Sequence, residues 1–147
     1  MSGTKQIAVI LVVVEDSDED FETVAEAVMR ADVSVEIRRA TTGEGGLELL
    51  RELAPDCPVV VLMDLNTPGT DGREALSCLK ADPALKSIPV IVFSTSSNPK
   101  DVGFCYSAGA NAYHVKPVRY PEHRQLVIDL VRYWIGRVAL PSGGTNP

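Results

Sequence analysis

The sequence has few of the residues that mark several large classes of protein. It contains three cysteines, Cys57, Cys78 and Cys105, which are an odd number without CxxC spacing. Neither a disulfide framework nor a zinc site is therefore indicated, so we expect reduced, mostly structural thiols. Lys and Arg number 14 against 20 for Asp and Glu, which leaves a formal net charge of −6. Because nucleic-acid binding needs a basic surface, this balance argues against a DNA or RNA partner.

Long apolar runs are also missing. The longest run, residues 7–14, is far shorter than the roughly 18 to 20 residues that cross a bilayer, and the acidic segment 15–20 follows it directly. A signal peptide needs a basic start, an apolar stretch and a small-residue cleavage site, whereas this run ends in carboxylates. We therefore expect a cytoplasmic protein without a membrane partner.

The residues that are present have the balance of an ordinary globular domain. Hydrophobic residues make up 45% of the chain and charged residues 23%. The length of 147 residues fits one domain of about 150 residues. We expect a single domain with one sizeable core.

Short β-branched runs alternate with helical patterns along the chain. Strands are expected at residues 7–14, 33–40, 59–63, 89–94 and 112–115, and helices at residues 21–29, 47–53, 73–81, 100–108 and 121–135. Ser17 and Asp20 have the spacing of a capping box, which places the start of the first helix. The alternation predicts an α/β fold with a doubly wound, flavodoxin-like five-stranded parallel sheet of order 2-1-3-4-5 and helices on both faces.

Carboxylates follow two strands that this sheet would place side by side. Glu15 and Asp16 come after the first expected strand, and Asp64 comes after the third. Ligands of such sheets bind beyond the carboxyl ends of the strands, so we expect the three side chains to converge. Crowded carboxylates take up protons unless a cation lies among them. A few hard oxygen ligands open to water favour Mg²⁺, or Mn²⁺, over zinc.

A hydroxyl and an ammonium group follow the next two strands. Ser94 closes the fourth expected strand, and Lys116 comes directly after the fifth. A phosphoryl group needs positioned donors and positive charge at its oxygens. Together with the acidic cluster, these residues predict a pocket suited to phosphoryl transfer.

This ordered set of residues resembles the receiver domain of two-component response regulators. The resemblance spans residues 6–135, including the spacing between Ser94 and Lys116, and it is carried by the segments VVVEDSDED, VVLMDLNTPGTDG, PVIVFSTSS and GANAYHVKPV. It implies a signalling protein rather than an enzyme, in which Asp64 accepts a phosphoryl group from a phosphohistidine of a sensor histidine kinase.

The resemblance also implies roles for the other residues of the pocket. Asp16 would bind Mg²⁺ directly, Glu15 directly or through water, and the backbone carbonyl of Asn66 would complete the protein ligands, along with Asp64. Lys116 would pair with the phosphoryl oxygens.

A conformational switch is implied as well. Ser94 would move to hydrogen-bond the phosphoryl group, and Tyr113 would follow into the vacated space. Ser96 lies two positions after Ser94, at a site where the family tunes phosphoryl lifetime. The Lys116–Pro117 step resembles a cis peptide of the family.

The last expected helix has more apolar residues than one buried stripe requires. Eight of the ten residues 126–135 are apolar. A helix buried under the tail would explain this pattern. We prefer a homodimer surface formed by this helix and the fifth strand, with Tyr133, Trp134 and Ile135 as candidate anchors.

The chain is also similar to response regulators of bacterial phytochrome kinases, through its acidic start, its serine-rich segment 94–98 and its apolar last helix. A bacteriophytochrome is therefore the expected kinase. Only 12 residues follow Ile135, so we expect a stand-alone receiver whose residues 136–147 form a short, partly flexible tail.

Two other functions share parts of this pattern. A phosphohydrolase of the haloacid-dehalogenase type also uses an aspartyl phosphate, Mg²⁺, a hydroxyl and a lysine, but its nucleophile typically lies on the first strand. A flavodoxin-like FMN carrier has the same sheet, but it needs a phosphate loop where this chain carries Glu15 and Asp16.

Overall fold

Parallel strands form a single sheet through the middle of the molecule. The computed structural model describes residues 9–53, 57–66 and 72–141, and within them the sheet has five strands in the order β2-β1-β3-β4-β5. These are β1 (Val9–Val14), β2 (Val35–Ala40), β3 (Val59–Met63), β4 (Val90–Ser94) and β5 (Ala112–Val115), and every neighbouring pair is parallel. The predicted topology is confirmed.

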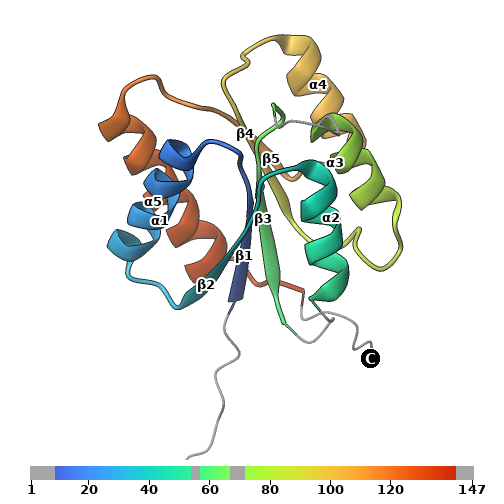
Figure 1. Cartoon of the computed structure of the whole chain (residues 1–147), viewed down its shortest axis with the longest axis horizontal. Coiled ribbons are helices and arrows are strands. Elements are labelled where there is room, and N and C mark those ends of the chain that lie inside the picture. The colour runs from blue at the N-terminus through green and yellow to red at the C-terminus, as the bar shows by residue number, and fades with distance from the viewer. Residues whose placement is uncertain (1–8, 54–56, 67–71, 142–147) are drawn as a thin grey trace, which may run out of the picture.

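Helices cover both faces of the sheet, as predicted (Figure 1). They are α1 (Asp18–Ala31), α2 (Gly43–Glu52), α3 (Gly72–Ala81), α4 (Pro99–Ala108) and α5 (Tyr120–Gly136). Successive strand residues point to opposite faces, so the core has two parts. Val12 and Val14 pack with α2 and α3, whereas Leu11 and Val13 pack with α1 and α5.

Capping residues set the starts of two helices that border the carboxyl edge of the sheet. Ser17 Oγ accepts a hydrogen bond from Asp20 N at 3.2 Å, which confirms the predicted start of α1. Asn98 Oδ1 accepts from Lys100 N at 2.9 Å, and Pro99 takes the first position of α4. Both helices therefore begin at the end of the molecule where strands β1 and β4 finish.

Some observed boundaries differ from the predicted ones. Strand β2 begins at Val35 rather than residue 33, because α1 continues to Ala31 and Asp32 then adopts a left-handed conformation with φ 55°. Helix α5 continues to Gly136, and Leu140 beyond it packs against the same apolar cluster as the helix. Residues 7 and 8 of the first expected strand lie outside the described residues.

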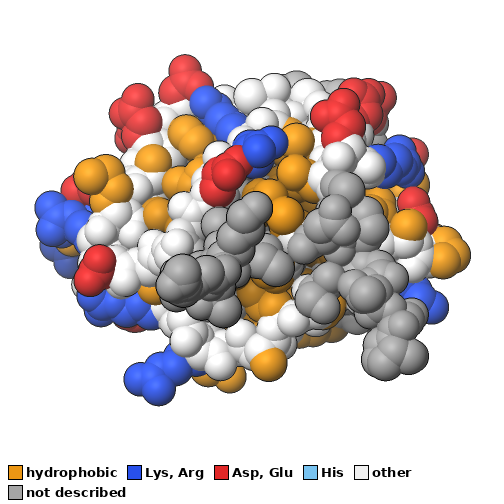
Figure 2. Space-filling view, turned by 90° about the horizontal axis from the view of Figure 1, so that it is seen from below, with side chains coloured by type: hydrophobic (Ala, Val, Ile, Leu, Met, Phe, Trp, Pro, Cys, Tyr) orange, Lys and Arg blue, Asp and Glu red, His pale blue; other side chains and the backbone are white. Residues whose placement is uncertain are grey.

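Apolar side chains gather at the amino ends of the strands, which is the end of the molecule seen in Figure 2. A small apolar pocket lies there between the sheet and α5, and Trp134 and Ile135 line it together with Leu11 and Val60. Tyr133 instead points outward and is 59% exposed. The rings of Tyr133 and Trp134 are in contact, with centroids 5.9 Å apart, and Trp134 and Ile135 are only partly buried. Among the described helices, none has the length and apolar character needed to cross a bilayer.

Candidate functional site

Three carboxylates meet where β1 and β3 end. Val14 is paired with Met63 in the register, and Asp64 N donates to Val14 O at 3.0 Å, so Glu15 and Asp64 follow neighbouring backbone positions. One carboxylate oxygen from each of Glu15, Asp16 and Asp64 lies within 4.8 Å of the others. Glu15 and Asp64 are buried, whereas Asp16 is exposed. The structure therefore brings together the acidic residues that the sequence singled out.

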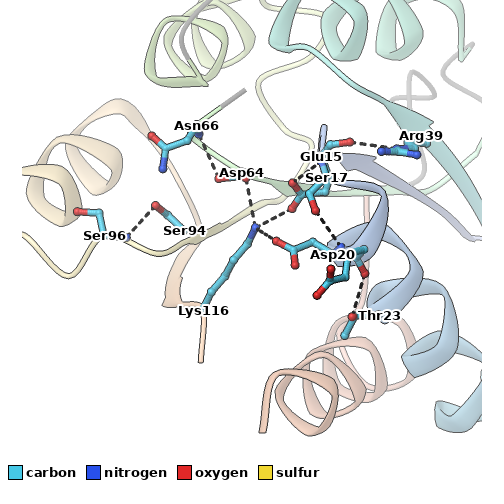
Figure 3. Close-up of polar contacts among 11 residues, drawn as sticks. Glu15, Ser17, Asp20, Thr23, Arg39, Asp64, Asn66, Ser94, Ser96 and Lys116 are labelled. Carbon is cyan, nitrogen blue, oxygen red and sulfur yellow. Dashed lines mark hydrogen bonds and ion pairs between the residues drawn. The ribbon is translucent and has the colours of Figure 1, made fainter. Parts of the chain in front are cut away.

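Lys116 reaches into this acidic cluster from the end of β5 (Figure 3). Its Nζ donates to Glu15 Oε1 at 2.7 Å, to Asp20 Oδ2 at 2.9 Å and to Asp64 Oδ2 at 3.2 Å. The side chain of Lys116 is only 6% exposed. A buried ammonium group thus binds three carboxylates and offsets part of their mutual repulsion.

Asp20 is the residue of this cluster that the sequence analysis did not assign to the site. Its position three residues after Ser17 indicated a reciprocal capping box, in which Asp20 would accept from Ser17 N. In the structure Ser17 N donates to Glu15 Oε2 at 3.2 Å instead, and the Asp20 side chain reaches Lys116. The acidic run after β1 was the available signal, but several of its residues could have supplied this contact.

Burial and pairing shift the pKa values of the two central groups. Burial raises the pKa of Glu15 to about 7, although the hydrogen bond from Lys116 opposes the shift. Burial lowers the pKa of Lys116, but the hydrogen bonds to Glu15 and Asp20 together with the negative charges of Asp64 and Glu15 outweigh burial and raise it. Lys116 therefore stays protonated, and Glu15 takes up a proton more readily than an ordinary glutamate.

Both carboxylate oxygens of Asp64 are held by hydrogen bonds. Asn66 N donates to Asp64 Oδ1 at 3.1 Å, and Lys116 Nζ binds Oδ2. Asn66 itself is exposed. This arrangement fixes the direction of the Asp64 carboxylate at the end of β3.

Ser94 lies fully buried at the end of β4, where its Oγ accepts from Ser96 N at 3.2 Å. Tyr113 on β5 donates its hydroxyl to Ser96 O at 2.8 Å. The two residues of the expected switch therefore both bind Ser96. The Lys116–Pro117 peptide is trans, so the cis expectation is wrong.

The donor set suits a hard divalent cation. Three carboxylates from two adjacent strand ends supply oxygen atoms close enough for one ion to bind all three. The exposed Asp16 leaves the cluster open to water, as Mg²⁺ prefers. The same cluster holds an oriented carboxylate and a lysine, which are the groups that a transferred phosphoryl group needs.

A comparison with protein families agrees with this chemistry. The family model of the response regulator receiver domain matches residues 10–128. The chain belongs to this family. Receiver domains take part in phosphoacceptor signalling with sensor histidine kinases and bind divalent metal ions, so the phosphohydrolase alternative finds no support.

Several receiver proteins are similar over most of their length. The response regulator Rcp1 of Synechocystis is 32% identical, and the aligned region covers 97% of this chain and 99% of Rcp1. The probable methanogenesis regulatory protein FilR2 of Methanothrix harundinacea is also 32% identical, over 86% of this chain and 84% of FilR2. The chain is thus similar to regulatory proteins of two different organisms.

Solved structures of two such receivers match the fold closely. The phosphorylated cyanobacterial phytochrome response regulator RcpA has a TM-score of 0.85 at 33% identity, with 92% of this chain and 99% of RcpA covered. The Mn²⁺-bound form of Rcp1 has a TM-score of 0.82 at 32% identity, with 90% and 98% covered. The receiver fold and its relation to phytochrome response regulators are therefore confirmed.

Proposed function

We propose that Asp64 is the phosphoacceptor of this receiver domain. The proposal rests on two hydrogen bonds that orient its carboxylate. Asn66 N donates to one oxygen and Lys116 Nζ donates to the other. These hydrogen bonds keep the carboxylate at the carboxyl end of β3, next to the exposed Asp16. Lys116 is then close enough to bind the oxygens of a phosphoryl group added to Asp64.

The proposed step is an in-line transfer from a phosphohistidine. One oxygen of Asp64 forms a bond to phosphorus while the phosphorus–nitrogen bond to the kinase histidine breaks, and the nitrogen leaves with the bonding pair. Lys116 neutralises charge on the transferred group. Ser94 then turns its hydroxyl toward that group, and Tyr113 follows.

We further propose that Glu15, Asp16, Asp64 and the backbone carbonyl of Asn66 hold Mg²⁺ or Mn²⁺. The clustering of three carboxylate oxygens supports this, as does the Mn²⁺-bound structure of the relative Rcp1. The ion supplies positive charge that balances the oxygens of the incoming phosphoryl group.

Labelling by a small phosphodonor tests the proposed acceptor. The protein is incubated with Mg²⁺ and acetyl phosphate, and its intact mass is measured. We expect a gain of one phosphoryl group that requires Mg²⁺, is removed by hydroxylamine and is absent in Asp64→Asn. The variant Asp82→Asn, which changes a surface carboxylate at the end of α3, serves as the matched control and should be labelled like the wild type. Labelling of Asp64→Asn at the wild-type level would overturn the assignment.

A second incubation separates signalling from enzymatic turnover. We propose that the chain is not an enzyme that acts on free substrates, in line with its family. Incubation with a small phosphomonoester should release no phosphate beyond a control without protein. Sustained release that depends on Asp64 would instead support a phosphohydrolase.

We infer that the partner kinase is a bacteriophytochrome, because RcpA, a phytochrome response regulator, and Rcp1 are similar to this chain over nearly their whole length. We place this transfer in the cytoplasm, where the kinase finds ATP, and three cysteines that form no disulfide with one another among the described residues suit that reducing compartment. Phosphotransfer from a purified bacteriophytochrome kinase should be fast and should change between red and far-red light. An equal or faster transfer from a kinase without a chromophore would contradict this pairing.

We also propose a homodimer through α5 and β5. Tyr133 is 59% exposed and Val115 43% exposed, so each offers apolar surface to a second copy. Sedimentation at tens of micromolar should show a dimer, and Tyr133→Ser should shift it toward the monomer. Met29→Ser removes an apolar side chain that is 82% exposed on α1 and should leave the dimer intact. A monomeric wild type, with or without phosphorylation, would overturn the proposal.

We propose that residues 6–135 form the receiver domain and that residues 136–147 form its tail. The packing of Leu140 on the apolar cluster supports a tail whose first residues lie against the domain. Removal of residues 139–147 should therefore lower the free energy of unfolding by about 1 kcal/mol while acetyl phosphate labelling continues.

A further inference from the structure

Ser96, in the loop between β4 and α4, is held at its amide, its carbonyl and its hydroxyl. The amide donates to Ser94 Oγ at 3.2 Å, and the carbonyl accepts from the Tyr113 hydroxyl at 2.8 Å. The Ser96 hydroxyl donates to Asp101 Oδ2 at 2.6 Å. The position of Ser96 therefore decides which partners Ser94 and Tyr113 have.

Asp101, in the first turn of α4, uses its two carboxylate oxygens for two different elements. Oδ2 accepts from Ser96, whereas Oδ1 accepts from Arg73 of α3, with Nη2 at 2.6 Å and Nε at 3.2 Å. The hydrogen bond from Ser96 and then those from Arg73 lower the pKa of Asp101, so this carboxylate is charged at neutral pH. Hydrogen bonds to a charged group are stronger than those between neutral groups.

Arg73, which ends this series of hydrogen bonds, is fixed next to the proposed acceptor Asp64. Gly72 N donates to Leu65 O at 3.1 Å, and a Cβ atom at Gly72 would lie 2.6 Å from Leu65 Cα. Helix α3 therefore begins in direct contact with the backbone that follows Asp64. Arg73 is the next residue of α3, so its guanidinium group extends from a fixed point.

We propose that Arg73, Asp101 and Ser96 form a bridge that holds the loop after β4 in its unphosphorylated conformation. Ser96 and Asp101 are then positioning residues, which act through Ser94. The inference rests on the proposed function, because Ser94 must leave the Ser96 amide when Asp64 carries a phosphoryl group. Since the bridge keeps Ser96 where its amide meets Ser94, it stabilises this conformation over any in which Ser96 has moved.

The affinity for beryllofluoride, which mimics the phosphoryl group, tests the bridge. Binding in the presence of Mg²⁺ is measured by titration for the wild type, Ser96→Ala, Asp101→Ala and the double variant. We expect each single variant to bind about three- to tenfold more tightly, the range expected for one lost charge-assisted hydrogen bond that is half exposed. Ser96→Ala also removes the hydrogen bond that Asn98 N donates to Ser96 Oγ at 3.2 Å. The double variant should therefore gain no more than Ser96→Ala alone, because both changes break the same bridge.

Two further variants separate positioning from a general change in stability. Ser96→Thr keeps the hydroxyl and should retain the wild-type affinity. Asp82→Ala removes a different ion pair, with Arg51 at 3.7 Å, and should also leave the affinity unchanged. Urea unfolding of all variants shows whether the affinity for beryllofluoride follows the free energy of unfolding. If the bridge acts as proposed, the two quantities should not change together.

The outcomes also distinguish this inference from the proposed function. If the wild type is labelled on Asp64 and binds beryllofluoride, but Ser96→Ala binds it with equal or weaker affinity, the bridge does not oppose the switch and the inference is wrong. Ser96→Ala decides this even if Asp101→Ala fails to fold, because it removes one loop hydroxyl. If the wild type neither binds beryllofluoride nor is labelled on Asp64, the proposed function fails.

Discussion

Lys116 and Asp20 are 96 residues apart in the sequence, yet Lys116 Nζ donates to Asp20 Oδ2 at 2.9 Å. The contact joins the end of β5 to the first turn of α1. It gives the buried ammonium group a third carboxylate partner besides Glu15 and Asp64. Lys116 therefore divides its hydrogen bonds between Asp20 and two of the residues proposed to hold the metal ion.

Asp20→Asn should weaken Mg²⁺ binding. The substitution removes one negative charge near the cluster and leaves Lys116 with Glu15 and Asp64 as its partners, and both effects disfavour the cation. We expect an affinity about threefold lower, measured by calorimetric titration. Asp18→Asn is the matched control, because Asp18 pairs with Arg39 and is 85% exposed. Equal affinities for both variants would contradict this role of Asp20.

Lys116→Met should destabilise the metal-free protein. Glu15 and Asp64 would lose their buried partner, and removal of one member of a buried ion pair costs about 3–5 kcal/mol. The loss should become smaller in Mg²⁺, since a cation can replace the ammonium charge. Urea unfolding with and without Mg²⁺ measures both effects, and Lys100→Met, which changes an exposed lysine of α4, is the control. An unchanged midpoint for Lys116→Met would show that the pair adds no net stability.

Gly72→Ala and Gly103→Ala should have opposite effects. A Cβ atom at Gly72 would lie 2.6 Å from Leu65 Cα, so alanine must push α3 away from the backbone next to Asp64. We expect a loss of about 2–3 kcal/mol in the free energy of unfolding. At Gly103, in α4, no atom lies within 4 Å of the added Cβ, and alanine should stabilise the helix by about 0.5–1 kcal/mol. Thermal unfolding of both variants measures these effects. A change in stability in the same direction for both variants would contradict the prediction.

His123 should make the protein less stable in mild acid. Its ring packs on Phe93 with centroids 5.2 Å apart, and burial lowers its pKa. Since the folded protein binds this proton less readily than the unfolded chain, the stability is full above the unfolded pKa of about 6.5 and is lost as the pH falls through the folded value. In His123→Phe this loss of stability should disappear. The contributions of the other titratable groups cancel when the variant is compared with the wild type.

The same variant also tests a buried nitrogen. His123 Nε2 finds no hydrogen-bond partner among the described residues, so its replacement by phenylalanine should be neutral or stabilise by about 1 kcal/mol at neutral pH. Urea midpoints at about pH 7.5 and about pH 5.5, on either side of the ordinary His pKa, give both quantities. Identical changes in the two proteins over this range would show that His123 is not the responsible group.

Much of the candidate site could be predicted because strand ends are local features. The apolar runs before Glu15 and Asp64 indicated two buried strands, and parallel strands finish at one edge of a sheet. In the observed register Val14 lies opposite Met63, so Glu15 and Asp64 follow at the same edge of the sheet, as predicted. Ser94 and Lys116 were found in the same way, from where the fourth and fifth apolar runs end.

Contacts between loops and helix ends were not predictable in this manner. Ser96 and Asp101 both lie near the end of β4 in the sequence, but their connection to Arg73 depends on how α3 and α4 pack. The spacing of Ser17 and Asp20 correctly indicated a helix start and incorrectly indicated a reciprocal cap, because Glu15 could reach the same amide. Local spacing identifies a side chain that can form a hydrogen bond, but it does not identify which of several nearby groups becomes the partner.

The sequence by itself determined the order of strands and helices, the edge of the sheet where the chemistry lies and the kinds of groups found there, since these follow from periodicity and from where each apolar run ends. Only the tertiary structure decided that Lys116 binds Asp20 as well as Glu15 and Asp64, and that Ser96 is tied through Asp101 to Arg73. These contacts join side chains from segments far apart in the chain, and their distances are set by the packing of helices on the sheet.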